Sequence, residues 1–162
     1  VKGRLPATNE PGHAAFAHVA VNPVDKAMIV LAALRALDAK RGARVHHPAL
    51  HAAIGRSTNL LVGDIRALGD GRASRVPPAV RLACALSFPP GEKVEAAIAA
   101  AANEDDFLRE TPPELVFLSG VTGAEVPLDH PLWAATSEAV RIGTGHIPEI
   151  NPLHTSSDIR NP

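Results

Sequence analysis

Histidines are the side chains of this chain that most invite a chemical role. The sequence has eight of them among 162 residues, and the densest group is His46, His47 and His51. A hydrolytic zinc site needs several His, Asp, Glu or Cys ligands at set spacings. No His-x-Asp pair, His-Glu-x-x-His motif or Cys-x-x-Cys motif occurs. The sequence therefore predicts a solvated loop over residues 43–58 and no metal ligands, with a metal site at the three histidines as the alternative.

The sequence contains neither a phosphate-binding loop nor the nucleophile motif of many serine hydrolases. Gly69-Asp70-Gly71 lacks the Gly-Lys-Ser/Thr ending and the following helix of a phosphate-binding loop. A strand pattern and two prolines follow, which is typical of a turn. The Gly-x-Ser-x-Gly elbow of many serine hydrolases does not occur.

Three further positions have both a structural and a functional interpretation: His13, His18 and the polar segment around Asp158. His13 and His18 lie among glycine and alanines, where a single histidine is either a hydrogen-bonded structural residue or a catalytic group. Asp158 and Arg160 follow Ser156-Ser157 near residue 160, and an ion pair that closes a turn is the simpler interpretation of them. From the residues alone, the chain is an α+β domain with a trailing helix.

Composition limits the partners and the compartment. The chain has 16 Lys and Arg against 17 Asp and Glu, so it carries no general positive field for nucleic acid or an anionic membrane surface. The single Cys84 cannot form an internal disulfide, which fits a reducing compartment. No apolar run approaches the roughly 20 residues of a membrane span. We therefore expect a cytoplasmic protein without nucleic-acid or membrane partners.

Hydrophobic periodicity predicts an alternating order of strands and helices. The expected elements are a first strand before residue 23, a helix over 23–40, strands over 59–68 and 79–88, a helix over 93–110, and a strand over 115–118. This order predicts a ferredoxin-like split βαβ fold, a four-stranded antiparallel sheet with two helices on one face. A linker over 121–129 and a trailing helix over 131–143 follow. We expect one domain over residues 1–120 and an incomplete second domain over 121–162.

Capping residues predict where these helices begin and end. Asn22 before Pro23 is typical of a helix start, and Gly42 is typical of a helix end. Pro112-Pro113 is expected to stop the second helix, because a residue before proline disfavours the helical region. Asp129 is expected to cap the trailing helix.

Eight short motifs follow one another along nearly the whole chain. They are Val1-Lys2-Gly3, Gly12-His13-Ala14 with Asn22 nine residues after the histidine, Asn59 to Ile65, Val76-Pro77, Phe88 to Glu92, Leu108 to Pro113, Pro127 to Leu132, and Ser156 to Arg160. In this order they resemble the lid, or dimerisation, domain and the start of the following catalytic part of a family of dizinc amidohydrolases. That family includes acetylornithine deacetylase, succinyl-diaminopimelate desuccinylase and the glutamate-type carboxypeptidases.

The resemblance implies a role within a larger enzyme. Such parents bind zinc mainly through residues before the lid, so this chain is expected to be inactive alone and to form a homodimer. The parent would hydrolyse an amide bond of an N-acyl amino acid or small peptide. His13 would stabilise the oxyanion in the partner subunit's active site, and Ser74, Ser156 and Ser157 would contact substrate. The resemblance does not remove two alternatives, a stand-alone ferredoxin-like interaction or ligand-binding module without catalysis, and a small enzyme built on His13, His18 and Asp158.

Two positions depart from the family pattern. Ser74 stands where the family commonly has an asparagine before the Val-Pro pair. Ser87 or Leu86 stands where the family commonly has an arginine that binds a substrate carboxylate. Neither side chain makes a charge-assisted bidentate contact, so either the substrate differs or another residue such as Arg81 replaces the missing arginine.

Overall fold

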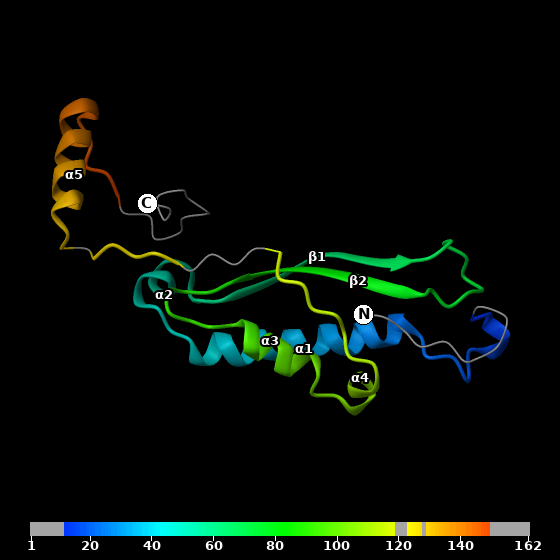
Figure 1. Ribbon diagram of the computed structural model, residues 1–162. Helices are drawn as coiled ribbons and strands as arrows, with labels where there is room; N and C mark the ends of the chain where they lie inside the picture. The colour runs from blue at the N-terminus through cyan, green and yellow to red at the C-terminus, as the bar shows by residue number, and fades with distance from the viewer. Residues whose placement is uncertain (1–11, 119–122, 128, 150–162) are drawn as a thin grey trace.

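Two long antiparallel strands form the framework of the computed structural model, which describes residues 12–118, 123–127 and 129–149 (Figure 1). β1 (Asn59–Leu68) and β2 (Ala79–Ser87) pair from Asn59 opposite Ser87 to Leu68 opposite Ala79. The two strands predicted from alternation over 59–68 and 79–88 are thus confirmed. The intervening residues 69–78 form the turn region of the hairpin.

The two faces of this hairpin differ in what they contact. Leu82, Cys84 and Leu86 of β2, at every second position, pack against the hydrophobic core. The register shifts between Val62 and Asp64, so one extra residue lies on β1 at Gly63. Such a bulge bends and twists its strand. The residues between the inward positions project from the opposite face.

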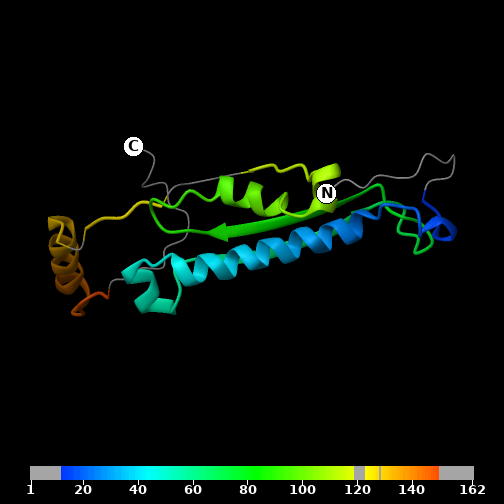
Figure 2. The ribbon, with the colours of Figure 1, turned by 90° about the horizontal axis from the view of Figure 1, so that it is seen from below.

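α1 (Pro23–Arg44) runs along the covered face of the hairpin (Figure 2). The Asn22 side chain accepts a hydrogen bond from the amide of Val24 at 3.0 Å, and Pro23 takes the first helical turn, as expected from the sequence. The buried apolar face of the helix is made of Ala27, Val30, Leu31 and Leu34. The predicted stop at Gly42 is wrong, because α1 continues to Arg44, where the amide of Val45 donates to the carbonyl of Arg41. The buried Arg41 side chain donates to the carbonyl of Ser87 at the end of β2.

The predicted helix over residues 93–110 is in fact two helices, α3 (Glu95–Ala102) and α4 (Asp106–Glu110). The Asn103 side chain donates to the carbonyl of Ala99 at 2.8 Å. The Asp105 side chain accepts from the amide of Phe107 at 2.9 Å and so starts a new helix. Asn and Asp side chains compete with helical backbone bonds in this way, which is why the alanine-rich run does not continue.

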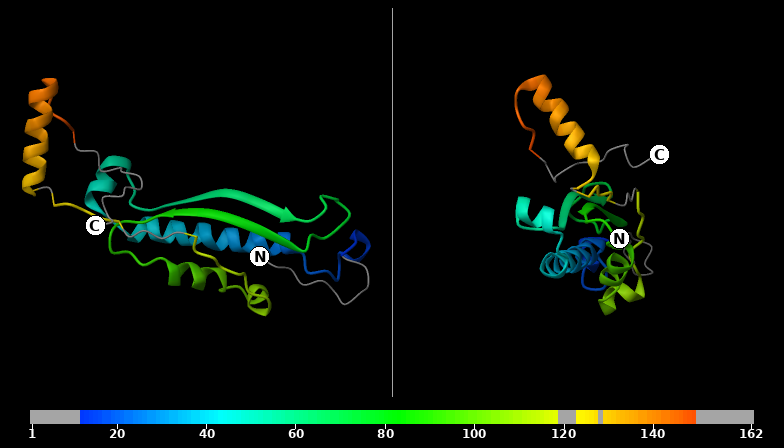
Figure 3. Two further views of the ribbon diagram at one scale, coloured as in Figure 1. Left: turned by 45° about the horizontal axis from the view of Figure 1, so that its top comes forward. Right: turned by 90° about the vertical axis from the view of Figure 1, so that its left-hand side faces the viewer.

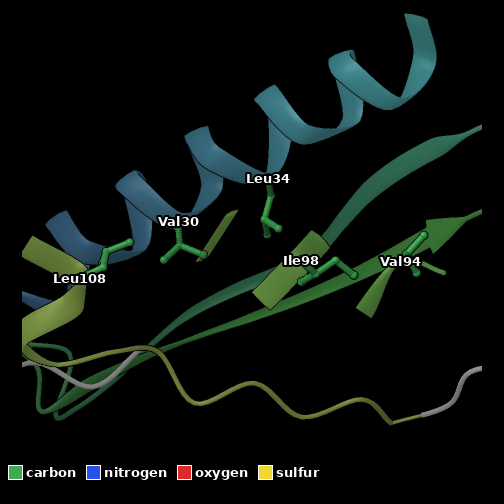
Figure 4. Packing of buried hydrophobic residues seen from close by; sticks show 5 residues of the cluster. All are labelled: Val30, Leu34, Val94, Ile98 and Leu108. Atoms are coloured by element: carbon green, nitrogen blue, oxygen red, sulfur yellow. The ribbon is translucent and has the colours of Figure 1, made fainter. Parts of the chain in front are cut away.

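The core lies between the first long helix and the segment containing α3 and α4. Figure 4 shows its central cluster, which consists of Val30, Leu34, Val94, Ile98 and Leu108. Burial raises the pKa of the Cys84 thiol beside this cluster. The thiol is therefore a packing group that stays protonated and not a poised nucleophile.

The expected four-stranded ferredoxin-like sheet is wrong for the described residues, where the sheet has two strands. The expected first strand is replaced by a 3-10 helix, η1 (Ala14–Phe16), and a turn. Residues 112–118 run back along the side of α3 without strand pairing (Figure 2). Two alanines in the first segment favour helix. Pro112 and Pro113, just before the expected strand over 115–118, have no N–H with which to begin a ladder.

One further helix was not predicted, and another begins with a different capping residue from the one predicted. α2 (Pro48–Ile54) occupies the region predicted as a loop, and the His47 side chain caps it by accepting from the amide of Leu50 at 3.5 Å. α5 (Pro131–Thr144) confirms the predicted trailing helix and stands at one end of the molecule (Figure 3). Its cap is His130, which accepts from the amide of Leu132 at 3.2 Å, and not Asp129.

Lys26 is a buried cation that ties α1 to the end of α4. Its side chain is 1% exposed and donates to the backbone carbonyl of Thr111 at 3.4 Å and to the Thr111 hydroxyl. Its ammonium also lies 4.7 Å from the centre of the Phe107 ring. Burial lowers the pKa of Lys26 from its ordinary value of 10.5, and nearby Glu110 partly opposes this.

The Lys26 shift predicts a pH-dependent stability difference. In the pH range just below 10.5 the unfolded chain keeps a proton on Lys26 that the folded chain releases, so the unfolding free energy should rise with pH there. Lys26→Met removes this group. Urea unfolding at pH 8 and pH 10.3 measures this effect. The unfolding free energy of the wild type, minus that of Lys26→Met, should be larger at pH 10.3 than at pH 8. The exposed Lys93→Met is the control, and an unchanged difference would contradict the assignment.

Candidate functional site

The chain segment containing His13 joins the hairpin where the turn leads into β2. The amide of Ala14 donates to the carbonyl of Ser74 at 2.8 Å, and the amide of Val76 donates to the carbonyl of Gly12 at 2.6 Å. His13 and Arg75 thereby face each other in an isolated antiparallel bridge. We call this region, residues 12–18 with residues 69–78, the tip; it lies at the end of the molecule opposite α5 (Figure 1).

The His13 side chain is exposed and has a defined hydrogen-bonding state. Its Nδ1 accepts a hydrogen bond from the amide of Ala15 at 3.2 Å, which caps η1. A neutral imidazole that accepts at Nδ1 carries its proton on Nε2. The ring therefore offers an N–H donor on its outer side. Gly12, with φ of +32°, makes the turn that leads into this residue.

The structure brings together two of the four residues that the sequence suggested as a site. Ser74 lies on the tip with an exposed side chain, and its backbone carbonyl is one of the groups that hold the His13 segment. Ser156 and Ser157 lie outside the described residues. The roles suggested for all four residues stay predictions.

Three charged side chains, Asp70, Arg72 and Arg75, lie close together on the tip. Arg75 Nη1 lies 3.6 Å from Asp70 Oδ2, and Arg72 Nε lies 3.7 Å from the same oxygen. The other Asp70 oxygen accepts from the amide of Arg72 at 3.1 Å and shapes the turn. These side chains and the prolines of the turn line a cavity of about 400 Å³. The sequence pattern did not indicate Arg75 as a site residue, because Arg75 comes close to His13 only when the two segments pair.

Arg81, the residue suggested as a substitute for the family arginine, lies elsewhere. It pairs opposite Arg66 within the body of the hairpin, on the face away from the core. Ser87 lies at the far end of β2, where its carbonyl accepts from Arg41 Nη2 at 3.0 Å. Neither residue takes part in the pairing of the tip.

The histidine group suggested as an alternative metal site has other partners. The rings of His46 and His51 lie 4.4 Å apart, centre to centre, and His47 Nε2 lies 3.2 Å from Glu125 Oε1. Within residues 12–118, 123–127 and 129–149, no three His, Cys, Asp or Glu side chains converge as a metal site requires. The described residues therefore do not fit a zinc ion.

A groove runs between α1 and the outer edge of β1. It has a volume of about 730 Å³, and its walls include Arg35, Ala39 and Gly42 from the helix and Leu60, Leu61 and Val62 from the strand. In the described part of the chain, this edge of β1 has no pairing strand. Free edges of this kind are templates for pairing with another chain.

The unpaired edge of β1 beside the long helix α1 defines a surface at which another chain can join the sheet, as in domains that assemble subunits. Residues 1–105 match the peptidase dimerisation domain of the M20 family, and the chain belongs to this family. No curated protein matches the chain. Among the described helices, none is long and apolar enough to cross a membrane.

Proposed function

We propose that this chain is the homodimerising lid domain of an amidohydrolase that cleaves the amide bond of an N-acyl amino acid or small peptide. The match of residues 1–105 to a peptidase dimerisation domain carries this proposal. In the proposal, residues 121–162 lead into the catalytic domain, and the chain is inactive alone because the remaining catalytic groups lie elsewhere in the enzyme.

The groove between α1 and β1 is the surface that we assign to the second copy. On a helix, residues three and four apart share a face, and the exposed face of α1 carries the uncharged residues Val24, Met28, Ala32 and Ala39. Leu61 is also exposed, on the strand that borders the groove. A two-fold axis would bring the same helix and strand edge of both copies together, and each would cover the apolar surface of the other.

His13 supplies the chemistry that this domain contributes in the proposal. Its Nε2–H would donate to the carbonyl oxygen of the amide bound in the partner subunit. As water attacks that carbonyl, negative charge develops on the oxygen, and a fixed donor stabilises it most in the transition state. The cap to Ala15 fixes the ring tautomer, so this donor is already in place before the substrate binds.

Sedimentation of the chain at micromolar concentrations tests the dimer. We expect a dimer, and we expect Ala39→Glu to weaken it by at least about a hundredfold, because the change places a larger, charged side chain where close contact between the copies would desolvate it. Ala100→Glu is the matched control, since Ala100 is an exposed alanine on α3. A chain that stays monomeric, or a dimer that only the control dissociates, would contradict the assigned surface.

A further inference from the structure

The bridge at the tip places two functional side chains on the same face. His13 and Arg75 form a non-hydrogen-bonded antiparallel pair, because the flanking residues make both backbone bonds. In such a pair the Cα atoms are only about 4.5 Å apart, closer than in the hydrogen-bonded kind, and the side chains leave from the same side. The guanidinium of Arg75 is therefore within reach of whatever the His13 ring contacts.

The guanidinium has binding capacity left for an anion. Its distance of 3.6 Å from Asp70 is longer than a charge-assisted hydrogen bond, and the two side chains are 43% and 44% exposed. An exposed ion pair of this kind contributes little. Asp70 also serves Arg72, so two guanidinium groups share one carboxylate in the described part of the tip.

We propose that Arg75 is a specificity-determining residue that binds the free carboxylate of the substrate while His13 contacts the scissile carbonyl. This inference rests on the proposed function. The planar guanidinium matches a carboxylate in a bidentate geometry. In an N-acyl amino acid the carboxylate is only a few bonds from the amide carbonyl, so neighbouring side chains can bind both groups. The loose contact with Asp70 is then exchanged for a closer one with the substrate.

Steady-state kinetics of the enzyme that carries this domain tests the inference with two probes, N-acetyl-leucine and N-acetyl-leucinamide. The second probe lacks the carboxylate. Arg75→Met should lower kcat/KM for N-acetyl-leucine by about ten- to a hundredfold, mainly through KM, and change N-acetyl-leucinamide less than about threefold. Arg75→Lys should recover part of the loss. Arg81→Met is the control and should leave the ratio between the probes unchanged.

The His13→Asn variant separates this inference from the function on which it rests. A loss of kcat with both probes in His13→Asn, together with the carboxylate-selective loss in Arg75→Met, supports both. If His13→Asn loses activity but Arg75→Met affects both probes equally or neither, the role of Arg75 is wrong. If His13→Asn keeps full activity, the proposed function of the tip is wrong.

Discussion

Replacing His13 by alanine is expected to lower kcat of the amidohydrolase that carries this domain by about 100- to 1,000-fold. That is the usual loss when one oxyanion donor is removed. The zinc content of the enzyme should not change, because His13 is proposed to contact substrate and not metal. The stability of the chain should change by only a few tenths of a kcal/mol, as is usual for an exposed side chain. Steady-state kinetics, elemental analysis and urea unfolding measure the three quantities.

Two variants make the His13 result specific. His13→Asn keeps an acceptor suited to a helix cap and removes the outer Nε2–H, so it should lose kcat as alanine does. His18→Ala removes an exposed histidine five residues further along the same segment and should leave kcat unchanged. Full activity in His13→Asn, or unfolding of His13→Ala, would show that the residue serves only as a cap.

Replacing Arg41 by alanine is expected to lower the unfolding free energy by about 3–5 kcal/mol. The Arg41 side chain is 2% exposed, and its Nε and Nη2 atoms lie 2.8 Å and 3.0 Å from the two Glu92 carboxylate oxygens. Nη2 also donates to the carbonyl of Ser87 at 3.0 Å. Removing the cation leaves the Glu92 carboxylate mostly buried without its partner, which is the costly case for an ion pair. Urea unfolding measures the loss.

A double variant shows how much of the unfolding free energy lost on replacing Arg41 comes from leaving the Glu92 carboxylate without a partner. Arg41→Met with Glu92→Met replaces both charges by apolar groups, and such replacements are often neutral or stabilising. We therefore expect it to be clearly more stable than Arg41→Met alone. Arg44→Ala, at an exposed position in the last turn of the same helix, should change stability little. Equal losses in Arg41→Met and the double variant would contradict this explanation.

Local patterns were sufficient for the hairpin and for the long helix. Alternation over residues 59–68 and 79–88 predicted both strands, because the two-residue period of a strand is a property of the segment itself. Asn22 and Pro23 predicted the start of α1, because a helix cap involves only neighbouring residues. The eight ordered motifs predicted the family, and the match over residues 1–105 confirms it.

The end of α1 and the existence of α2 were less predictable from local patterns. α1 continues past Gly42 to Arg44, and its buried Arg41 binds Glu92 and Ser87, which lie more than forty residues further along the chain. His47 caps α2 in a region without clear periodicity, so no pattern indicated that helix.

The sequence by itself determined the two strands of the hairpin, the start of α1 and the family of this protein, all of which follow from patterns of residues near one another in the chain. Only the tertiary structure decided that the sheet of the described residues has two strands and that His13 faces Arg75. His13 and Arg75 are 62 positions apart in the sequence. Their side chains meet only because backbone bonds between residues 12–14 and 74–76 close the tip, and pairing across such a distance depends on which segments find each other and not on local propensity.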